Sequence, residues 1–213
     1  AMTASPLTGT CSNIEALVGS TYEDRLTGSN SGSTFTVSGN KEGTVDSWFE
    51  FSAVDILTGS AADDLLDYST YTGAAAFDLT SIGGLGGFNG TETNSGIVFE
   101  NIDEIIGSTF VDTLQGLDVA STWTVTSLDA GLYASTGRQL NFSAVEGLIG
   151  ETGADQLDLS GYGSAVTVNL DGPGSMDGFS GTFAGLTTGF DNINSITATA
   201  ESTDRLIGAN LDA

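Results

Sequence analysis

The sequence predicts an all-β, single-domain protein, a parallel β-solenoid (β-helix). First, one short frame of residues recurs five times within 213 residues, which indicates a repeat architecture. Second, apolar and polar residues alternate in many short runs, as they do on strands with one buried face. Third, 30 glycines and only 2 prolines suit many short strands joined by turns better than long helices.

The frame consists of two apolar residues three apart, then a glycine, an aspartate five residues after the glycine, and a further apolar residue two positions later. The fifth copy has an alanine in place of the glycine and one extra residue before its aspartate. The copies are Ile14/Leu17/Gly19/Asp24/Leu26, Val54/Leu57/Gly59/Asp64/Leu66, Ile102/Ile105/Gly107/Asp112/Leu114, Val145/Leu148/Gly150/Asp155/Leu157 and Ile193/Ile196/Ala198/Asp204/Leu206.

The spacing of the frame aspartates is 40, 48, 43 and 49 residues. Short and long steps alternate, so repeats of about 45 residues are paired into double units of about 90, and each repeat fits two solenoid coils. A β-propeller has a similar period, but its blades would not alternate in length. We expect residues 1–12 to be a tag remnant and N-terminal edge, 13–100 and 101–191 two double repeats, and 192–213 the start of a third, all in one solenoid.

The strands and turns expected in the first double repeat recur in the same order in the second. Residues 34–37 and 48–51 are expected as strands with a turn at 40–43, and 74–79 as a further strand. The second double repeat repeats this order with strands at 122–125 and 165–170. Two glycine-rich segments, 82–96 and 171–189, lack a period and are expected as loops.

Charge narrows the range of functions. The net charge is −24, with 28 acidic residues, 4 basic residues and no histidine, so nucleic acid and anionic membranes are excluded as direct partners. No apolar run approaches the roughly 20 residues of a membrane span, so we expect no membrane insertion. General acid–base groups are scarce, and we expect a protein that is not an enzyme.

Part of the frame, Gly-x4-Asp-x-Leu, resembles the calcium-binding nonapeptide of the RTX (repeats-in-toxin) family. Gly150, Gly153, Asp155 and Leu157 carry the resemblance, which implies Ca²⁺ as a ligand although no cofactor is required. The alternative is that each frame aspartate caps its own turn by accepting backbone N–H bonds. The candidate calcium ligands are Asp24, Asp63, Asp64, Asp67, Asp112, Asp155, Asp158 and Asp204.

The whole double repeat resembles the long repeats of giant bacterial surface proteins and adhesins that follow the type I secretion route. The segments that carry this resemblance are 101–108, 122–125, 141–150, 155–162 and 165–170. It implies an extracellular stalk, adhesin or filament segment on a bacterial surface. Its partners would be neighbouring repeats and other copies joined head to tail.

Two alternative functions stay open. The chain could bind a glycan or a protein through the segments 82–96 and 171–189. It could also be a β-helical polysaccharide lyase, although such an enzyme needs basic residues converging on its carboxylates, and Arg25 and Arg205 lie far apart in the sequence.

The side-chain pattern makes further predictions. Leu57, Ile105 and Leu148 are expected to stack as one ladder in the core. Trp48 and Trp123 are expected in the core as well. Tyr68, Tyr71 and Tyr162 are surrounded by turn residues and are expected to be partly exposed, where they could stack on a sugar.

Overall fold

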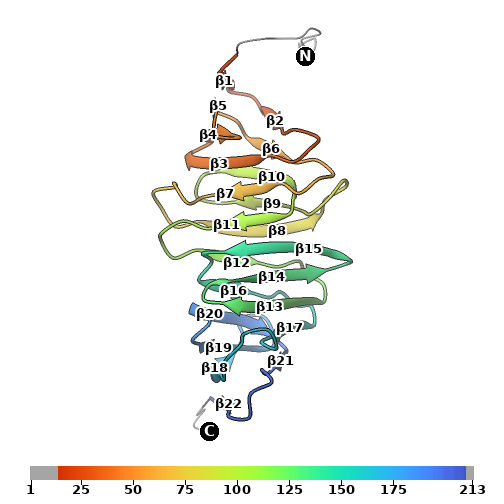
Figure 1. Cartoon of the computed structure of the whole chain (residues 1–213), viewed down its shortest axis with the longest axis vertical. Coiled ribbons are helices and arrows are strands. Elements are labelled where there is room, and N and C mark those ends of the chain that lie inside the picture. The colour runs from red at the N-terminus through yellow and green to blue at the C-terminus, as the bar shows by residue number, and fades with distance from the viewer. Residues whose placement is uncertain (1–13, 210–213) are drawn as a thin grey trace.

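The computed structural model describes residues 14–209, and all of its regular elements are β-strands. They form two eleven-stranded sheets. The strands of each sheet follow one another along the long axis of an elongated molecule, whose N- and C-terminal strands lie at opposite ends (Figure 1). The all-β prediction is therefore confirmed for the described residues. Within them, nothing helical is present that could cross a membrane. The predicted tag remnant, 1–12, lies outside the described residues.

The sheets are called A and B below. In spatial order, sheet A contains β1 (Ala16–Val18), β5 (Phe49–Ser52), β4 (Glu42–Val45), β3 (Thr34–Gly39), β7 (Leu65–Asp67), β11 (Glu104–Ile106), β15 (Arg138–Ser143), β14 (Ala130–Ser135), β13 (Ser121–Ser127), β17 (Asp155–Asp158) and β21 (Ser195–Thr197). Sheet B contains β2 (Arg25–Thr27), β6 (Ile56–Thr58), β10 (Ile97–Ile102), β9 (Phe88–Glu92), β8 (Ala76–Ile82), β12 (Thr113–Gln115), β16 (Gly147–Ile149), β20 (Leu186–Ile193), β19 (Phe179–Phe183), β18 (Thr167–Pro173) and β22 (Arg205–Ile207).

The chain of each repeat, called a unit below, lies first in one sheet, then in the other, and then again in the first. Its frame gives one strand to each sheet, and three further strands then form an antiparallel meander back in the first sheet, as β1, β2 and β3–β5 do. Each unit ends in the sheet in which it began, and the chain then crosses to the other sheet. The next unit therefore begins in the opposite sheet, with β6, β7 and the β8–β10 meander. Two units are needed to return to the starting sheet. This exchange gives the double unit a structural basis.

The meanders correct two predictions. Pairs that connect successive units, such as β7 with β11, are parallel as expected, whereas pairs inside a meander are antiparallel. The segments 82–96 and 171–189 are not loops, because they contain the central meander strands β9 and β19.

A glycine beneath an aromatic ring explains why these segments look irregular. A Cβ on Gly90 of β9 would lie 2.4 Å from the ring of Phe99 on β10, so only glycine leaves room for the ring. The same arrangement recurs in β19, where a Cβ on Gly181 would lie 2.6 Å from the ring of Phe190. The missing side chain interrupts the apolar alternation that marks a strand in the sequence.

The core lies between the sheets and is lined by the apolar residues of the frames. Leu57, Ile105 and Leu148 are all buried, but the prediction that they form a single ladder is wrong. Ile105 lies in sheet A between Leu66 and Phe142. Leu57 and Leu148 lie in sheet B. Two ladders result because successive units exchange sheets.

Candidate functional site

The frame aspartate accepts hydrogen bonds from two successive units. Asp64 is 1% exposed; its Oδ2 accepts from the amide of Ser60 at 2.6 Å and from its hydroxyl at 3.0 Å. Its Oδ1 accepts from the amide of Ser33, in the preceding unit, at 2.7 Å. These bonds replace the water that the carboxylate loses on burial. The alternative that this aspartate caps its own turn is confirmed.

The other frame aspartates accept equivalent bonds, so the turn at every frame is held by a carboxylate. In three of these four copies, a donor from the preceding unit is also present. The partners are Ser20 for Asp24, Ser108 and Ala75 for Asp112, Glu151 and Ser121 for Asp155, and Thr199 and Val166 for Asp204.

A second acidic or amide side chain ties each frame to the following unit. The amide of Asp64 donates to Oδ2 of Asp103 at 3.1 Å, and the amide of Asp112 donates to Oε2 of Glu146 at 2.7 Å. Asp55 and Asn194 accept in the same way from Asp24 and Asp155. Sequence reasoning missed these residues. The available signal was that each directly follows the first apolar residue of its frame, where the copies read Glu, Asp, Asp, Glu and Asn.

Burial makes ionisation of several of these carboxyls unfavourable. It raises the pKa of Asp112 and of Asp155 above the usual aspartate value, while their N–H and O–H donors act in the opposite direction. Burial likewise raises the pKa of Asp103 and Glu146. The shifts follow from desolvation, which disfavours the charged form. These groups connect successive units, so their protonation is coupled to folding.

Close backbone contact explains why the frame contains a glycine. A Cβ on Gly107 would lie 1.8 Å from the carbonyl oxygen of Ala144, a residue of the same unit with a left-handed backbone (φ 52°). Gly19, Gly59 and Gly150 face the carbonyls of three further left-handed residues, Ala53, Asn101 and Asn192, in the same way. The frame therefore needs glycine for a close backbone approach, as well as an aspartate for hydrogen bonding.

The eight candidate calcium ligands are not brought together. Among residues 14–209, no group of three or more acidic, cysteine or histidine side chains is arranged to hold a metal ion. Asp67 and Asp158 each accept the amide two residues later, at 2.8 and 2.9 Å. Asp63 lies at the edge of the groove described below. Calcium binding by these residues stays a prediction, and N–H donors already occupy the positions around the buried carboxylates where a cation would bind.

Three aromatic side chains differ from the predictions. Trp48 is 66% exposed, because it lies in the turn before β5, whereas Phe51 of β5 is buried in the core and Phe49 packs against it. Tyr68 and Tyr71 are 0% and 9% exposed, and the hydroxyl of Tyr68 lies 2.8 Å from that of Ser95. A hydrogen bond for the polar end lets the tyrosine ring join the core. Trp123 is buried as predicted.

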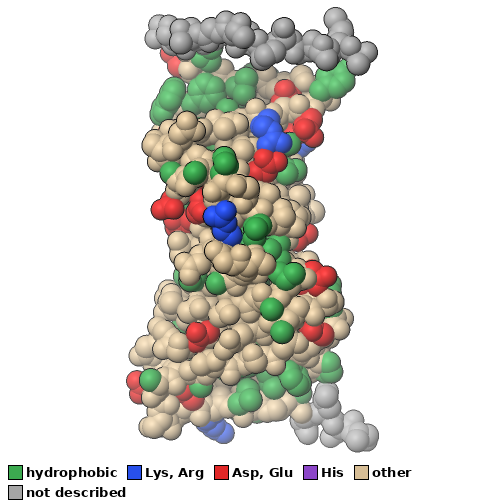
Figure 2. All heavy atoms as spheres, turned by 90° about the vertical axis from the view of Figure 1, so that its right-hand side faces the viewer, with side chains coloured by type: hydrophobic (Ala, Val, Ile, Leu, Met, Phe, Trp, Pro, Cys, Tyr) green, Lys and Arg blue, Asp and Glu red, His purple; other side chains and the backbone are tan. Residues whose placement is uncertain are grey.

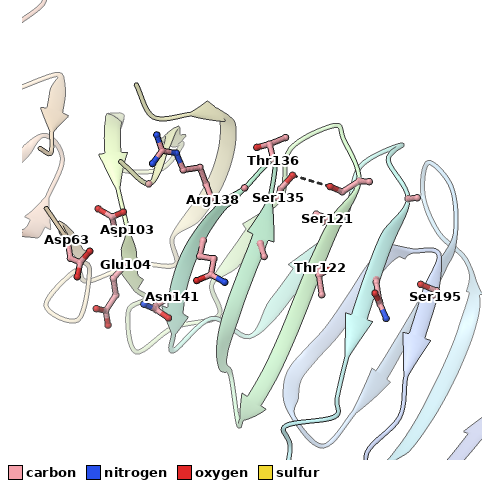
Figure 3. A pocket seen from close by; sticks show the side chains of 17 residues that line it. Asp63, Asp103, Glu104, Ser121, Thr122, Ser135, Thr136, Arg138, Asn141 and Ser195 are labelled. Carbon is pink, nitrogen blue, oxygen red and sulfur yellow. Dashed lines mark hydrogen bonds between the residues drawn. The ribbon is translucent and has the colours of Figure 1, made fainter. Parts of the chain in front are cut away.

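An open groove of about 850 Å³ crosses the outer face of sheet A. Its lining is polar and comes from several strands. Figure 3 shows Asp63, Asp103 and Glu104 at one end, Ser195 at the other, and Arg138, Asn141 and Thr122 between them. The segment 82–96 contributes only Gly87 to this lining, and 171–189 contributes nothing.

Basic side chains are rare on the surface, and most of the charge in the space-filling view is acidic (Figure 2). Within the described range, Arg25 pairs with Glu100 and Lys41 with Asp55. These contacts lower the pKa of both carboxyls. Arg138 forms no ion pair with the described residues. Its guanidinium lies 3.5 Å from the carbonyl oxygen of Gly83.

Comparison with protein families, with curated proteins and with solved structures finds no match.

Proposed function

We propose that the chain is a β-solenoid module that serves as a stalk, adhesin or filament segment of a large secreted bacterial surface protein. The stack of units supports this proposal, since each unit is tied to its neighbours by frame aspartates and by strand pairing. Such quasi-one-dimensional arrays build length by repetition. The bacterial surface is inferred from the resemblance of the double repeat to surface-protein repeats, and the acidity is compatible with it.

The observation that carries the proposal is the contrast between interior and terminal frames. Leu114 on β12 is fully buried, whereas Leu206, at the same frame position on β22, is 63% exposed. At the other end, the first apolar residue of the frame, Ile14, is 46% exposed, whereas its interior counterparts Val54, Ile102 and Val145 are fully buried. Burying a leucine side chain is worth about 1.5–3 kcal/mol. Both ends of the described range therefore present apolar side chains that are covered in the interior units.

The direction of the outer strands permits stacking of one copy on another. Each meander contains two antiparallel steps, so the strand direction before it is restored after it. Strands β1 and β21, at the two ends of sheet A, consequently run in the same direction, and β2 and β22 do so in sheet B. Head-to-tail contact would therefore create parallel pairs, in an open arrangement that does not close on itself.

The contact would be weaker than an interior junction. In the interior, β11 pairs with β15, the third meander strand of its own unit. The equivalent terminal strand, β21, would instead pair with β1 of a second copy. Repulsion between chains of net charge −24 also opposes association, and it decays over about 10 Å at 0.1 M salt. We expect weak association that strengthens with salt.

Sedimentation velocity at high protein concentration and increasing salt tests the proposal. Leu206→Lys places a charge in the terminal contact and should return the sample to monomer. Val111→Lys is the matched control, because Val111 is exposed in the turn between β11 and β12, away from both ends. A strictly monomeric protein at every salt concentration, or equal loss in both variants, would argue against head-to-tail assembly.

A further inference from the structure

The groove on sheet A has a floor of small side chains and walls of hydrogen-bonding ones. Ala134 on the central meander strand β14 lies between Gln139 of β15 and Thr122 of β13 in the strand register. The row continues through Gln156 of β17 to Ser195 of β21. The alanine creates the hollow, because its neighbours in the row carry larger side chains.

Several polar side chains of this groove are free to bind. The side chains of Thr122, Gln139, Asn141 and Ser195 form no hydrogen bond with any described residue, and Arg138 has no carboxylate partner there. Amides supply donors and acceptors together, the guanidinium supplies donors only, and carboxylates accept. At one end, Asp103 and Glu104 supply such carboxylates. The groove thus offers both kinds of hydrogen-bonding group within a short distance.

These features select the class of ligand. A strongly anionic ligand would meet a chain of net charge −24 and carboxylates in the lining. A lipid would find no large apolar side chain among the lining residues. A peptide strand cannot extend the sheet here, because the groove lies on its face and not at an edge. Sugar hydroxyls donate and accept at once, and they match the mixture of amides, carboxylates and one guanidinium.

The arrangement of the groove also favours a linear ligand. Its polar side chains come from strands stacked about 4.8 Å apart, so similar groups recur along the long axis of the molecule. A volume of about 850 Å³ lies within the usual range for ligand pockets, roughly 300–1,000 Å³. We propose that this groove binds a neutral oligosaccharide laid across β15, β14, β13 and β17. No aromatic side chain lines it, so binding rests on hydrogen bonds, with a Kd on the order of 0.1–1 mM.

The test is a titration of the labelled protein with cellohexaose and with maltohexaose, followed by amide chemical shifts. Shifts with one of them, confined to the groove strands, are expected. Ala134→Tyr fills the floor and should weaken binding by about tenfold or more. Thr91→Tyr is the control, because Thr91 occupies the central strand of a meander on the outer face of sheet B. Should Ala134→Tyr lose its dispersed spectrum, Arg138→Gln at the rim of the groove serves instead, with a several-fold loss expected.

Three results would overturn the inference. The first is the absence of groove shifts with either neutral sugar at about 10 mM. The second is binding that survives both Ala134→Tyr and Arg138→Gln unchanged. The third is a tighter complex with hexagalacturonate, an acidic comparator of similar length. Head-to-tail assembly is measured separately by sedimentation, so failure of either proposal leaves the other testable.

Discussion

Replacing Gly107 with alanine tests the close contact on which every interior frame depends. The new Cβ would lie 1.8 Å from the carbonyl oxygen of Ala144, and real Cβ atoms essentially never come closer than 3.0 Å. The two chain segments must therefore separate by about 1.2 Å, the difference between these two distances. Such a shift would strain the bond from the Gly107 amide to the Ser143 carbonyl, 2.9 Å long, and open the packing around β11 and β15.

Overpacking of a tight core costs about 1–3 kcal/mol, and a stretched buried hydrogen bond adds about 1 kcal/mol. We expect Gly107→Ala to lower the free energy of unfolding by about 3 kcal/mol, measured by urea unfolding followed by circular dichroism. Gly84→Ala is the matched control, because a Cβ there would meet nothing within 4 Å. Its effect should be near zero or slightly stabilising. A loss below about 1 kcal/mol for Gly107→Ala would refute the steric account of the frame glycine.

Three further predictions concern the carboxylates. Asp112→Asn should cost about 1–3 kcal/mol, because its amide group cannot accept from both Ser108 and Ala75; exposed Asp171→Asn serves as control in the same unfolding assay. The pKa of Asp103, Asp112, Glu146 and Asp155 is raised in the folded state, so these four groups bind more protons in the native state and their contribution to stability is lost as pH rises through the folded values. The melting temperature should therefore be higher at pH 5 than at pH 7, and a flat or opposite trend would count against this coupling. The fold should persist in chelator, with similar small gains in melting temperature from Ca²⁺ and Mg²⁺; a random-coil spectrum on chelation would instead support specific calcium binding.

The sequence predicted those features that depend on local patterns. The recurring frame indicated a repeat architecture, and alternation located strands such as β3 and β13. Turn chemistry also offered the alternative that each frame aspartate caps its own turn, which the structure confirms for Asp64. These predictions succeed because the interactions involved lie within a few residues of one another.

The missed features depend on contacts between distant residues. Nothing local in 82–96 shows that the ring of Phe99 covers Gly90, so the sequence predicts a loop where the structure has β9. The sheet in which Ile105 lies depends on how many times the preceding chain crosses between the sheets. The residues around Ile105 do not indicate that number. Tyr68 is buried because Ser95 hydrogen-bonds to it from another strand. The groove around Ala134 combines residues from strands far apart in the chain.

The exchange of sheets makes a prediction about deletions. Removing residues 101–191 takes out one double unit and joins Glu100 to Asn192, which shares its left-handed backbone with Asn101 (φ 57° and 56°). The frame that follows then begins in the same sheet as the frame it replaces, and β21 and β22 take the places of β11 and β12. Neighbouring units keep their alternation.

Removing residues 54–101 takes out a single unit and breaks this alternation. The Val54 amide donates to the Lys41 carbonyl at 3.2 Å, and Asp55 pairs with the Lys41 side chain. The deletion puts Ile102 at that place, after Ala53, although in the intact chain Ile102 follows Asn101, a residue of the deleted unit that accepts the Leu85 amide at 3.0 Å. Although it removes fewer residues, we expect the single-unit deletion to lose amide dispersion and cooperative melting at the new junction. The double-unit deletion should keep both, because stability in a stacked array depends mainly on contacts between nearest neighbours. Equal behaviour of the two variants would show that adjacent units are interchangeable, and the double unit would then be a feature of spacing without structural consequence.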